Sequence, residues 1–293
     1  MVVLLGGYFL QRARRLDTRP IATLSIYVLS PCLIFSSLVK SSLTASEVWD
    51  ALAFVALLYG LTWLATKAIV VLSRLDRSQE SVMFLSTLFV NSGNYGLPVV
   101  NFALGPEGLA RAILFLVAHA FPTSSAAVYY ASRGTRPASE ALKAVVTTPM
   151  LYGPVFAILV RAFHIPLVNW KPVFAPIDML GQAAIPVALF TLGMELANVQ
   201  KQGIEKSELS LLSAAVLMRL VGGPLIAFLL VGVLGITGMM AKAMIIEASM
   251  PTAVNTLLLV LTFGGRSKLQ ASSVFLSTVL SFISLSVILA ILL

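Results

Sequence analysis

Two polar segments interrupt apolar stretches of this 293-residue sequence, and their residue types can bind ions and small anions. Residues 91–101 (NSGNYGLPVVN) and residues 247–255 (EASMPTAVN) each combine asparagine with proline. Proline removes a backbone donor and clashes with the preceding helical turn, so each segment should interrupt a helix. A helix interrupted within a membrane offers carbonyl groups to a cation and N-terminal N–H groups to an anion. The two segments are therefore the candidate site.

Two ionisable residues lie in or near these segments. A carboxylate within a membrane span, such as that of Glu247, costs about 2.5 kcal/mol or more on insertion. Glu247 is therefore a candidate Na⁺ ligand, proton carrier or partner of a buried cation. Arg219 lies in another apolar stretch, where it could bind a substrate carboxylate through two hydrogen bonds or neutralise Glu247. Both roles of Arg219 stay open.

The overall composition places these segments in a helical membrane protein. Hydrophobic residues make up 58% of the chain and charged residues only 11%, against about 25% charged residues in a soluble domain. This excludes an ordinary globular enzyme and a disordered chain. The net charge of +8 does not indicate a nucleic-acid partner, because the basic residues are scattered between apolar runs. Those runs are continuous, unlike the alternating segments of about ten residues that form a barrel.

Stretches without charged residues predict ten membrane spans. Each is expected to be helical, because backbone groups in hydrocarbon must be satisfied within their own segment. The first stretch provides about 15 Å of helix, half of a ~30 Å hydrocarbon core, so span 1 is expected to be truncated. The predicted spans are residues 1–11, 21–39, 51–73, 81–104, 109–132, 141–162, 176–197, 208–234, 240–263 and 269–293.

The two halves of the chain resemble each other in register. Residues 30–35 of span 2 recur as residues 185–190 of span 7, an offset of 155. Residues 94–98 of span 4 recur as residues 247–251 of span 9, an offset of 153. With five spans each, the second copy enters the membrane from the opposite side, as in the inverted repeats of secondary transporters. The predicted repeats are residues 1–137 and 138–293.

The basic residues predict the orientation of the chain. Of the 20 lysines and arginines, 14 lie in loops after odd-numbered spans and five in loops after even-numbered spans. The positive-inside rule then places the odd loops, including the loop between spans 5 and 6, in the cytoplasm. The C-terminus, which follows span 10, is expected outside.

These segments also carry a family resemblance. The chain resembles, over essentially its whole length, a bacterial member of the auxin efflux carrier family, which contains plant PIN transporters and bacterial malonate-type carriers. The most specific matches are residues 91–101 and 250–255, supported by residues 29–38 and 186–196. The resemblance implies an all-α polytopic fold of ten transmembrane helices, in which broken helices 4 and 9 cross.

The resemblance also implies a mechanism. Spans 1, 2, 6 and 7 would form a scaffold that makes a homodimer. Spans 3–5 and 8–10 would form a transport domain that moves like an elevator. The cargo would be a small organic anion, auxin-like or a mono- or dicarboxylate, crossing the lipid bilayer of a bacterial inner membrane.

One segment departs from the plant pattern. Residues 247–250 resemble the helix-9 segment of bile-acid sodium symporters, where a glutamate helps to bind Na⁺. This similarity favours coupling to Na⁺ or H⁺ through Glu247, with an uncoupled facilitator or a transporter-fold sensor without flux as alternatives. No enzyme, no cofactor and no metal other than Na⁺ is predicted. The substrate-binding candidates are Asn91, Asn94, Tyr95, Gly96, Pro98, Asn101, Arg219, Pro251, Thr252 and Asn255. The coupling-ion candidates are Glu247, Asn94, Thr123, Ser249 and Met250.

Overall fold

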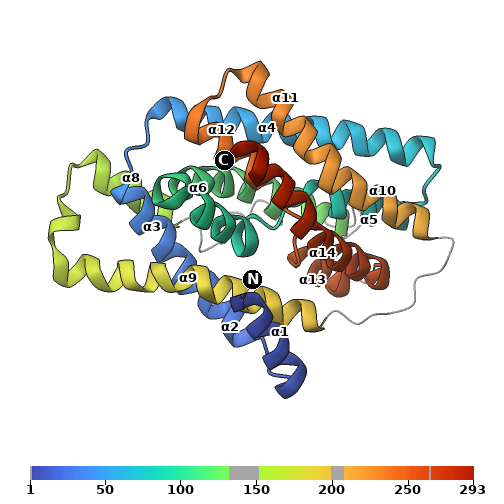
Figure 1. Cartoon of the computed structure of the whole chain (residues 1–293), viewed down its shortest axis with the longest axis horizontal. Helices are drawn as coiled ribbons and strands as arrows, with labels where there is room; N and C mark the ends of the chain where they lie inside the picture. Colours follow the sequence, from blue (N-terminus) through green and yellow to red (C-terminus); the bar gives the residue numbers. More distant parts are fainter. Residues whose placement is uncertain (1, 132–151, 199–207, 264) are drawn as a thin grey trace.

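The computed structural model describes residues 2–131, 152–198, 208–263 and 265–293 (Figure 1). These residues form helices joined by short loops, and strand-like pairing within them is limited to one isolated bridge. The all-α class is thus confirmed. In chain order the α-helices are α1 (Val2–Arg14), α2 (Arg19–Leu24), α3 (Ser30–Lys40), α4 (Ala45–Leu72), α5 (Arg77–Leu88), α6 (Leu97–Ala131), α8 (Tyr152–Ala162), α9 (Lys171–Asn198), α10 (Leu209–Leu217), α11 (Gly223–Leu234), α12 (Gly238–Ala248), α13 (Asn255–Phe263) and α14 (Ser267–Leu292). The π-helical turns are η1 (Ser25–Leu29), η2 (Ser92–Gly96) and η6 (Met218–Gly222), and η4 (Leu167–Asn169) is a 3₁₀ turn.

Six helical segments in the described part of the chain are long and apolar enough to cross a membrane. They are Arg19–Lys40, Ala45–Leu72, Ser92–Ala120, Lys171–Asn198, Leu209–Leu234 and Ser267–Leu292. Predicted spans 4 and 9 are each divided by a break, and span 1 corresponds to the 13-residue α1. Residues 141–151 of span 6 and the loop between spans 5 and 6 lie outside the described residues. The count of ten spans stays a prediction.

Helix α6 contains a sharp turn. Gly105 has φ 69° and ψ −165°, and Pro106 follows it. An L-residue with a side chain rarely adopts this backbone conformation, so glycine allows the turn. The turn divides Ser92–Ala120 between predicted span 4, which ends at residue 104, and predicted span 5, which begins at residue 109.

A π-helical turn precedes each of three prolines. η1 lies before Pro31, η2 before Pro98 and η6 before Pro224. A proline ring clashes with the carbonyl four residues earlier, and in each case that residue is the central one of the π turn. The extra residue in the turn relieves the clash while the helix continues. These wider turns set the directions in which the η2 and η6 side chains point.

The helices pack mainly in two groups. The first helix group is α1, α2, α3, α8 and α9, and the second is α4–α6 with α10–α14 (Figure 1). Helices α3 and α9 of the first group contact η2 and α6 of the second. Within the first group, α1 crosses α9 so closely that a Cβ on Gly7 or Gly193 would overlap a backbone carbonyl of the other helix. Glycine at these two positions lets the short α1 pack tightly on α9.

Candidate functional site: two helix breaks that meet

One helix break lies at the start of the first polar segment and the other lies within the second. Helix α5 ends at Leu88, and residues 89–91 lie outside helical structure before η2 begins. The first break thus lies on the N-terminal side of the glycines and proline of its segment. Helix α12 ends at Ala248, and residues 249–254 stay outside helical structure until α13 begins. Each break exposes backbone groups that need partners in the interior of the protein.

The backbones of the two breaks pair with each other. Val90 and Thr252 form the antiparallel bridge. The Asn91 amide N–H donates to the Pro251 carbonyl at 2.9 Å, and the Ala253 N–H donates to the carbonyl of residue 89 at 2.8 Å. We call this pair of segments, residues 89–91 and 249–254, the crossing. The pairing supplies hydrogen-bond partners to several backbone N–H and C=O groups that have none within their own broken helix.

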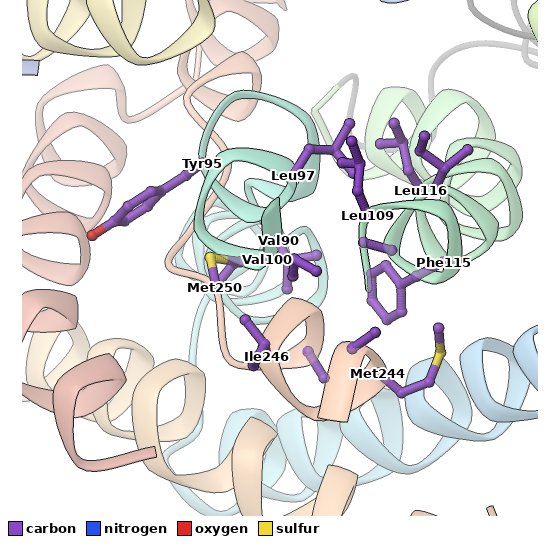
Figure 2. Close-up of a cluster of buried hydrophobic side chains, with 14 of the residues drawn as sticks. Val90, Tyr95, Leu97, Val100, Leu109, Phe115, Leu116, Met244, Ile246 and Met250 are labelled. Atoms are coloured by element: carbon purple, nitrogen blue, oxygen red, sulfur yellow. The ribbon is translucent and has the colours of Figure 1, made fainter. Parts of the chain in front are cut away.

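Apolar side chains hold the crossing from one side. Figure 2 shows Val90 and Val100 gathered with Ile246 and Met250 in a single buried cluster. Tyr95 points the other way, toward α14, where its ring lies 6.1 Å from that of Phe282 (Figure 2). The crossing therefore sits against a packed apolar core, which makes its backbone rigid.

Glu247 is buried against η2, with 0% of its surface exposed. A Cβ on Gly96 would overlap its carboxyl group, so only glycine leaves room at that position. The Ser92 hydroxyl lies nearby, but neither carboxyl oxygen has a hydrogen-bond partner among the described residues. A buried carboxyl without a partner is costly. Its surroundings suit a group that binds a cation or carries a proton.

Unpartnered polar groups also lie where the chain enters η2. Asn91 is 5% exposed and its side-chain Nδ2 has no hydrogen-bond partner. The Ser92 hydroxyl is buried and also without a partner. The N-terminus of a helix favours negative charge. At the N-terminal end of η2, the buried side-chain amide of Asn91 adds a further hydrogen-bond donor. The crossing thus combines a free donor with the free acceptor of Glu247.

Arg219 projects from η6 to the ends of both broken helices. Its Nη1 donates to the Thr87 carbonyl at 2.5 Å, and its Nη2 donates to the Ala248 carbonyl. The side chain is buried, and no ion pair joins it to Glu247, although the structure describes both residues. Of the two roles that the sequence left open, direct neutralisation of Glu247 therefore does not occur in this structure.

The remaining candidate residues are distributed around the crossing. Pro98 is buried, and Asn94 is partly buried at the centre of η2. The Ser249 hydroxyl donates to a carbonyl of α12 at 2.6 Å. The Thr123 hydroxyl bonds the ring of His119 at 3.0 Å. Asn255 is exposed at the start of α13.

Two cavities lie where the first helix group faces the second. The larger, of about 660 Å³, is bounded by α3, α9 and α6 and includes Asn101. Its charged lining is Lys40, Glu107, Arg111 and Asp178. The smaller, of about 180 Å³, is mainly apolar and lies beside Tyr95 and Pro98. The larger cavity offers a polar space of the size that small-molecule sites occupy.

A buried polar cluster around the second break is not among the sequence predictions. Thr252 donates from its N–H to Ser277 at 3.2 Å and from its hydroxyl to the Ser86 carbonyl at 2.8 Å. Gln270, which is fully buried, donates to Thr256 at 2.7 Å. A signal for this cluster exists in the sequence, because polar residues recur every three or four positions along the apolar α14. These positions are Gln270, Ser273, Ser277 and Ser281.

Comparison with known proteins gives the family. A family model described as "Membrane transport protein" matches the chain twice, over residues 1–136 and residues 135–289. The chain belongs to this family. It is the auxin efflux carrier (PIN-like) family that the sequence motifs indicate, a family of transporters and not of enzymes.

Relatives support the same assignment. The chain is 26% identical over 297 residues to a protein of Methanocaldococcus jannaschii named as an uncharacterized transporter. It is 27% identical over 290 residues to a protein of the same description from Methanothermobacter thermautotrophicus. Each alignment covers 97% of this chain and 93% of the relative. With its apolar helices, the chain is an integral membrane protein with a transport function.

Proposed function

We propose that this membrane transport protein is a secondary transporter for a small organic anion, either auxin-like or a mono- or dicarboxylate. The observation that carries the proposal is the crossing, where two broken helices pair beside a buried free carboxyl and a buried free amide. Paired breaks in corresponding segments are typical of transporter binding sites. An intact helical bundle would have no need to bury unpartnered groups at this point.

The proposed architecture is ten transmembrane helices in two inverted repeats, residues 1–137 and 138–293, with broken helices 4 and 9 crossing. Two observations support it. The family model matches the chain twice, over nearly the same two ranges. Each half also contains one helix break, at residues 89–91 in the first half and at residues 249–254 in the second.

The proposed movement is of the elevator type. The first helix group would be the scaffold, joining two copies into a homodimer, and the second group would carry the crossing across the bilayer. The packing supports this division. Contacts within each helix group outweigh the contacts that α3 and α9 of the first group make with η2 and α6 of the second. The orientation, with the loop between spans 5 and 6 in the cytoplasm and the C-terminus outside, rests on the basic-residue count, and a bacterial inner membrane is the expected location.

The substrate would bind at the N-terminal end of η2 and reach it from the larger cavity. Asn91 and Asn94 supply amides at η2, and Asn101, Lys40 and Arg111 line the cavity. Each of these two cations pairs with a carboxylate, at 2.6 Å for Lys40 with Asp178 and 2.7 Å for Arg111 with Glu47. In the proposed site, Lys40 and Arg111 would bind the anionic substrate when they release their carboxylate partners.

Glu247 would hold the coupling ion, either Na⁺ or H⁺, with Asn94, Thr123, Ser249 and Met250 as further candidates. Its burial without a hydrogen-bond partner supports this role. The alternatives are an uncoupled organic-anion facilitator and a sensor that binds its ligand without flux. No organic cofactor and no nucleic-acid partner is proposed.

Counterflow in proteoliposomes tests the proposal. Vesicles loaded with one unlabelled mono- or dicarboxylate should accumulate the same labelled anion, and Asn91→Ala should reduce this by about tenfold through loss of a buried hydrogen bond. Uptake driven by a Na⁺ or pH gradient should fail in Glu247→Gln and persist in Glu80→Gln, whose carboxylate pairs with Lys67. Ligand-dependent thermal stabilisation with no counterflow for any anion would favour the sensor.

A further inference from the structure

Both broken helices end in a carbonyl that lacks its ordinary backbone partner. In a continuous helix the Thr87 carbonyl would accept from the Asn91 N–H, but that N–H donates to the Pro251 carbonyl. The Ala248 carbonyl would accept from the Thr252 N–H, but that N–H donates to a serine hydroxyl of α14. The pairing of the two breaks therefore leaves two orphan carbonyls at two helix C-termini, inside the protein.

Arg219 satisfies both carbonyls with one side chain. Its two terminal nitrogens donate to Thr87 and Ala248, and a Cβ on Gly223 would overlap the guanidinium. The side chain is 2% exposed and has no acidic partner among the described residues. A buried cation without a counter-ion is costly, but here it faces the negative ends of two helix dipoles. Helix termini and the arginine thus stabilise each other.

Ion-coupled transporters place a bound cation at this kind of position. In their broken helices, unwound carbonyls and half-helix C-termini coordinate Na⁺. Here the corresponding carbonyls already receive hydrogen bonds from a covalently attached cation. The planar guanidinium presents several N–H donors in a fixed fork and can bond two separate acceptors at once. A lysine ammonium is a compact point charge and bridges two acceptors less well.

We propose that Arg219 is a built-in cation that takes the place of an alkali ion between the two half-helix ends and so positions the crossing. Arg219 is then a positioning residue and not a ligand of the substrate. Through the Ala248 carbonyl it fixes the neighbouring Glu247, and through the Thr87 carbonyl it fixes the chain that leads into η2. The positioning role of Arg219 does not depend on the proposed function. Only the roles of the groups that it positions, ion coupling and substrate binding, rest on that proposal.

The test removes the charge and asks whether an alkali ion restores what is lost. The full-length protein is purified as wild type, Arg219→Met and Arg219→Lys, and unfolded by heat in NaCl, KCl or choline chloride at equal ionic strength. In choline, Arg219→Met should have a Tm lower by roughly 10 °C, because two charge-assisted hydrogen bonds are lost. Na⁺ should restore about 3 °C or more of this by binding the freed carbonyls, and Arg219→Lys should lie between the other two.

Arg161→Met is the matched control. Arg161 also donates to backbone carbonyls, at 2.9 Å to Ser41 and 2.9 Å to Leu43, but near the end of α3 and away from the crossing. Its variant should lose stability without any gain from Na⁺ beyond that of wild type. A purely structural role for Arg219 would give the same pattern, so an Arg219→Met protein that gains no more from Na⁺ or K⁺ than wild type overturns the proposal.

Failure to recover a variant in folded form also tests the proposal. If Arg219→Met can be recovered folded only in Na⁺ or K⁺, an alkali ion replaces the guanidinium and the proposal is supported. If it is recovered in no salt while Arg219→Lys is recovered, no alkali ion replaces the guanidinium and the proposal fails. If neither variant is recovered in any salt, the charge is insufficient and the proposal fails. Counterflow by the wild type is measured separately, so that a failure of the proposed transport function is distinguished from a failure of this inference.

Discussion

Replacing the buried carboxyl of Glu247 should remove ion coupling without removing stability. A glutamine amide has almost the same shape as a carboxyl group. The structure gives neither carboxyl oxygen a hydrogen-bond partner, so Glu247→Gln removes no hydrogen bond and keeps the packing on Gly96. The residue is 0% exposed, so the variant also spares the protein the desolvation of a carboxylate. Most substitutions of buried charged residues destabilise, and this one should not.

Two magnitudes distinguish a free carboxyl from a member of an ion pair. Removing one partner of a buried pair costs about 3–5 kcal/mol. Relieving an unsatisfied buried polar group instead returns about 1–3 kcal/mol, less whatever the new amide leaves unsatisfied. At roughly 2–4 °C of Tm per kcal/mol, we expect Glu247→Gln to change the Tm by between zero, where the amide leaves as much unsatisfied as the carboxyl, and about +12 °C.

Thermal unfolding in Na⁺-free buffer is the assay, because Na⁺ bound to the wild-type carboxylate would raise the wild-type Tm by mass action. Glu80→Gln is the control. Glu80 pairs with Lys67 at 2.6 Å and is partly exposed, so its loss should cost less than about 1 kcal/mol. A fall in Tm of more than about 6 °C for Glu247→Gln would refute the reasoning, because it would mean that the carboxyl has a partner in the folded protein.

Three further substitutions test the packing around the site. Gly96→Ala should push the Glu247 carboxyl aside and reduce uptake, whereas Gly93→Ala, whose Cβ would meet only a leucine methyl at 3.8 Å, should leave uptake near wild type in the same counterflow assay. Thr252→Val should lower the Tm by roughly 3–6 °C, since it removes a buried hydroxyl that donates to a carbonyl of α5 at 2.8 Å; an unchanged Tm would show that this bond contributes little. Gly193→Ala should destabilise by about 1–3 kcal/mol because its Cβ would overlap a carbonyl of α1, and equal denaturation curves for variant and wild type would contradict the close crossing of α1 and α9.

The positions of the helices and the family could be predicted from the sequence. Helices in a membrane follow from uninterrupted apolar length, which is a local property, and the described helices lie close to the predicted spans. A break is predicted near each of two prolines, because proline acts on its own helical turn, and the second break does include Pro251. The first break lies at residues 89–91, about two helical turns before Pro98, whose own preceding turn is the π turn η2. The same clash explains the π turns, although the sequence analysis did not anticipate that a helix would widen before Pro31, Pro98 and Pro224.

The partners across the site could not be predicted. Val90 and Thr252 are 162 positions apart, and no pattern of residue types indicates that their backbones pair. Arg219 was considered for two roles that involve carboxylates, but its partners are backbone carbonyls, which every residue has. Because every residue has a backbone carbonyl, the residue types in the sequence do not indicate which carbonyls accept such a hydrogen bond.

The sequence by itself therefore predicted the apolar helical segments, a break that includes Pro251, and that a carboxyl and a guanidinium lie among apolar residues. The family resemblance implied that the two broken helices cross. The tertiary structure decided which backbone groups pair there, that the guanidinium bonds the ends of both broken helices, and that the carboxyl has no hydrogen-bond partner beside Gly96. The physical reason is range. Hydrophobic length and proline geometry act within a few residues, whereas a hydrogen bond to an orphan carbonyl depends on how distant helices pack.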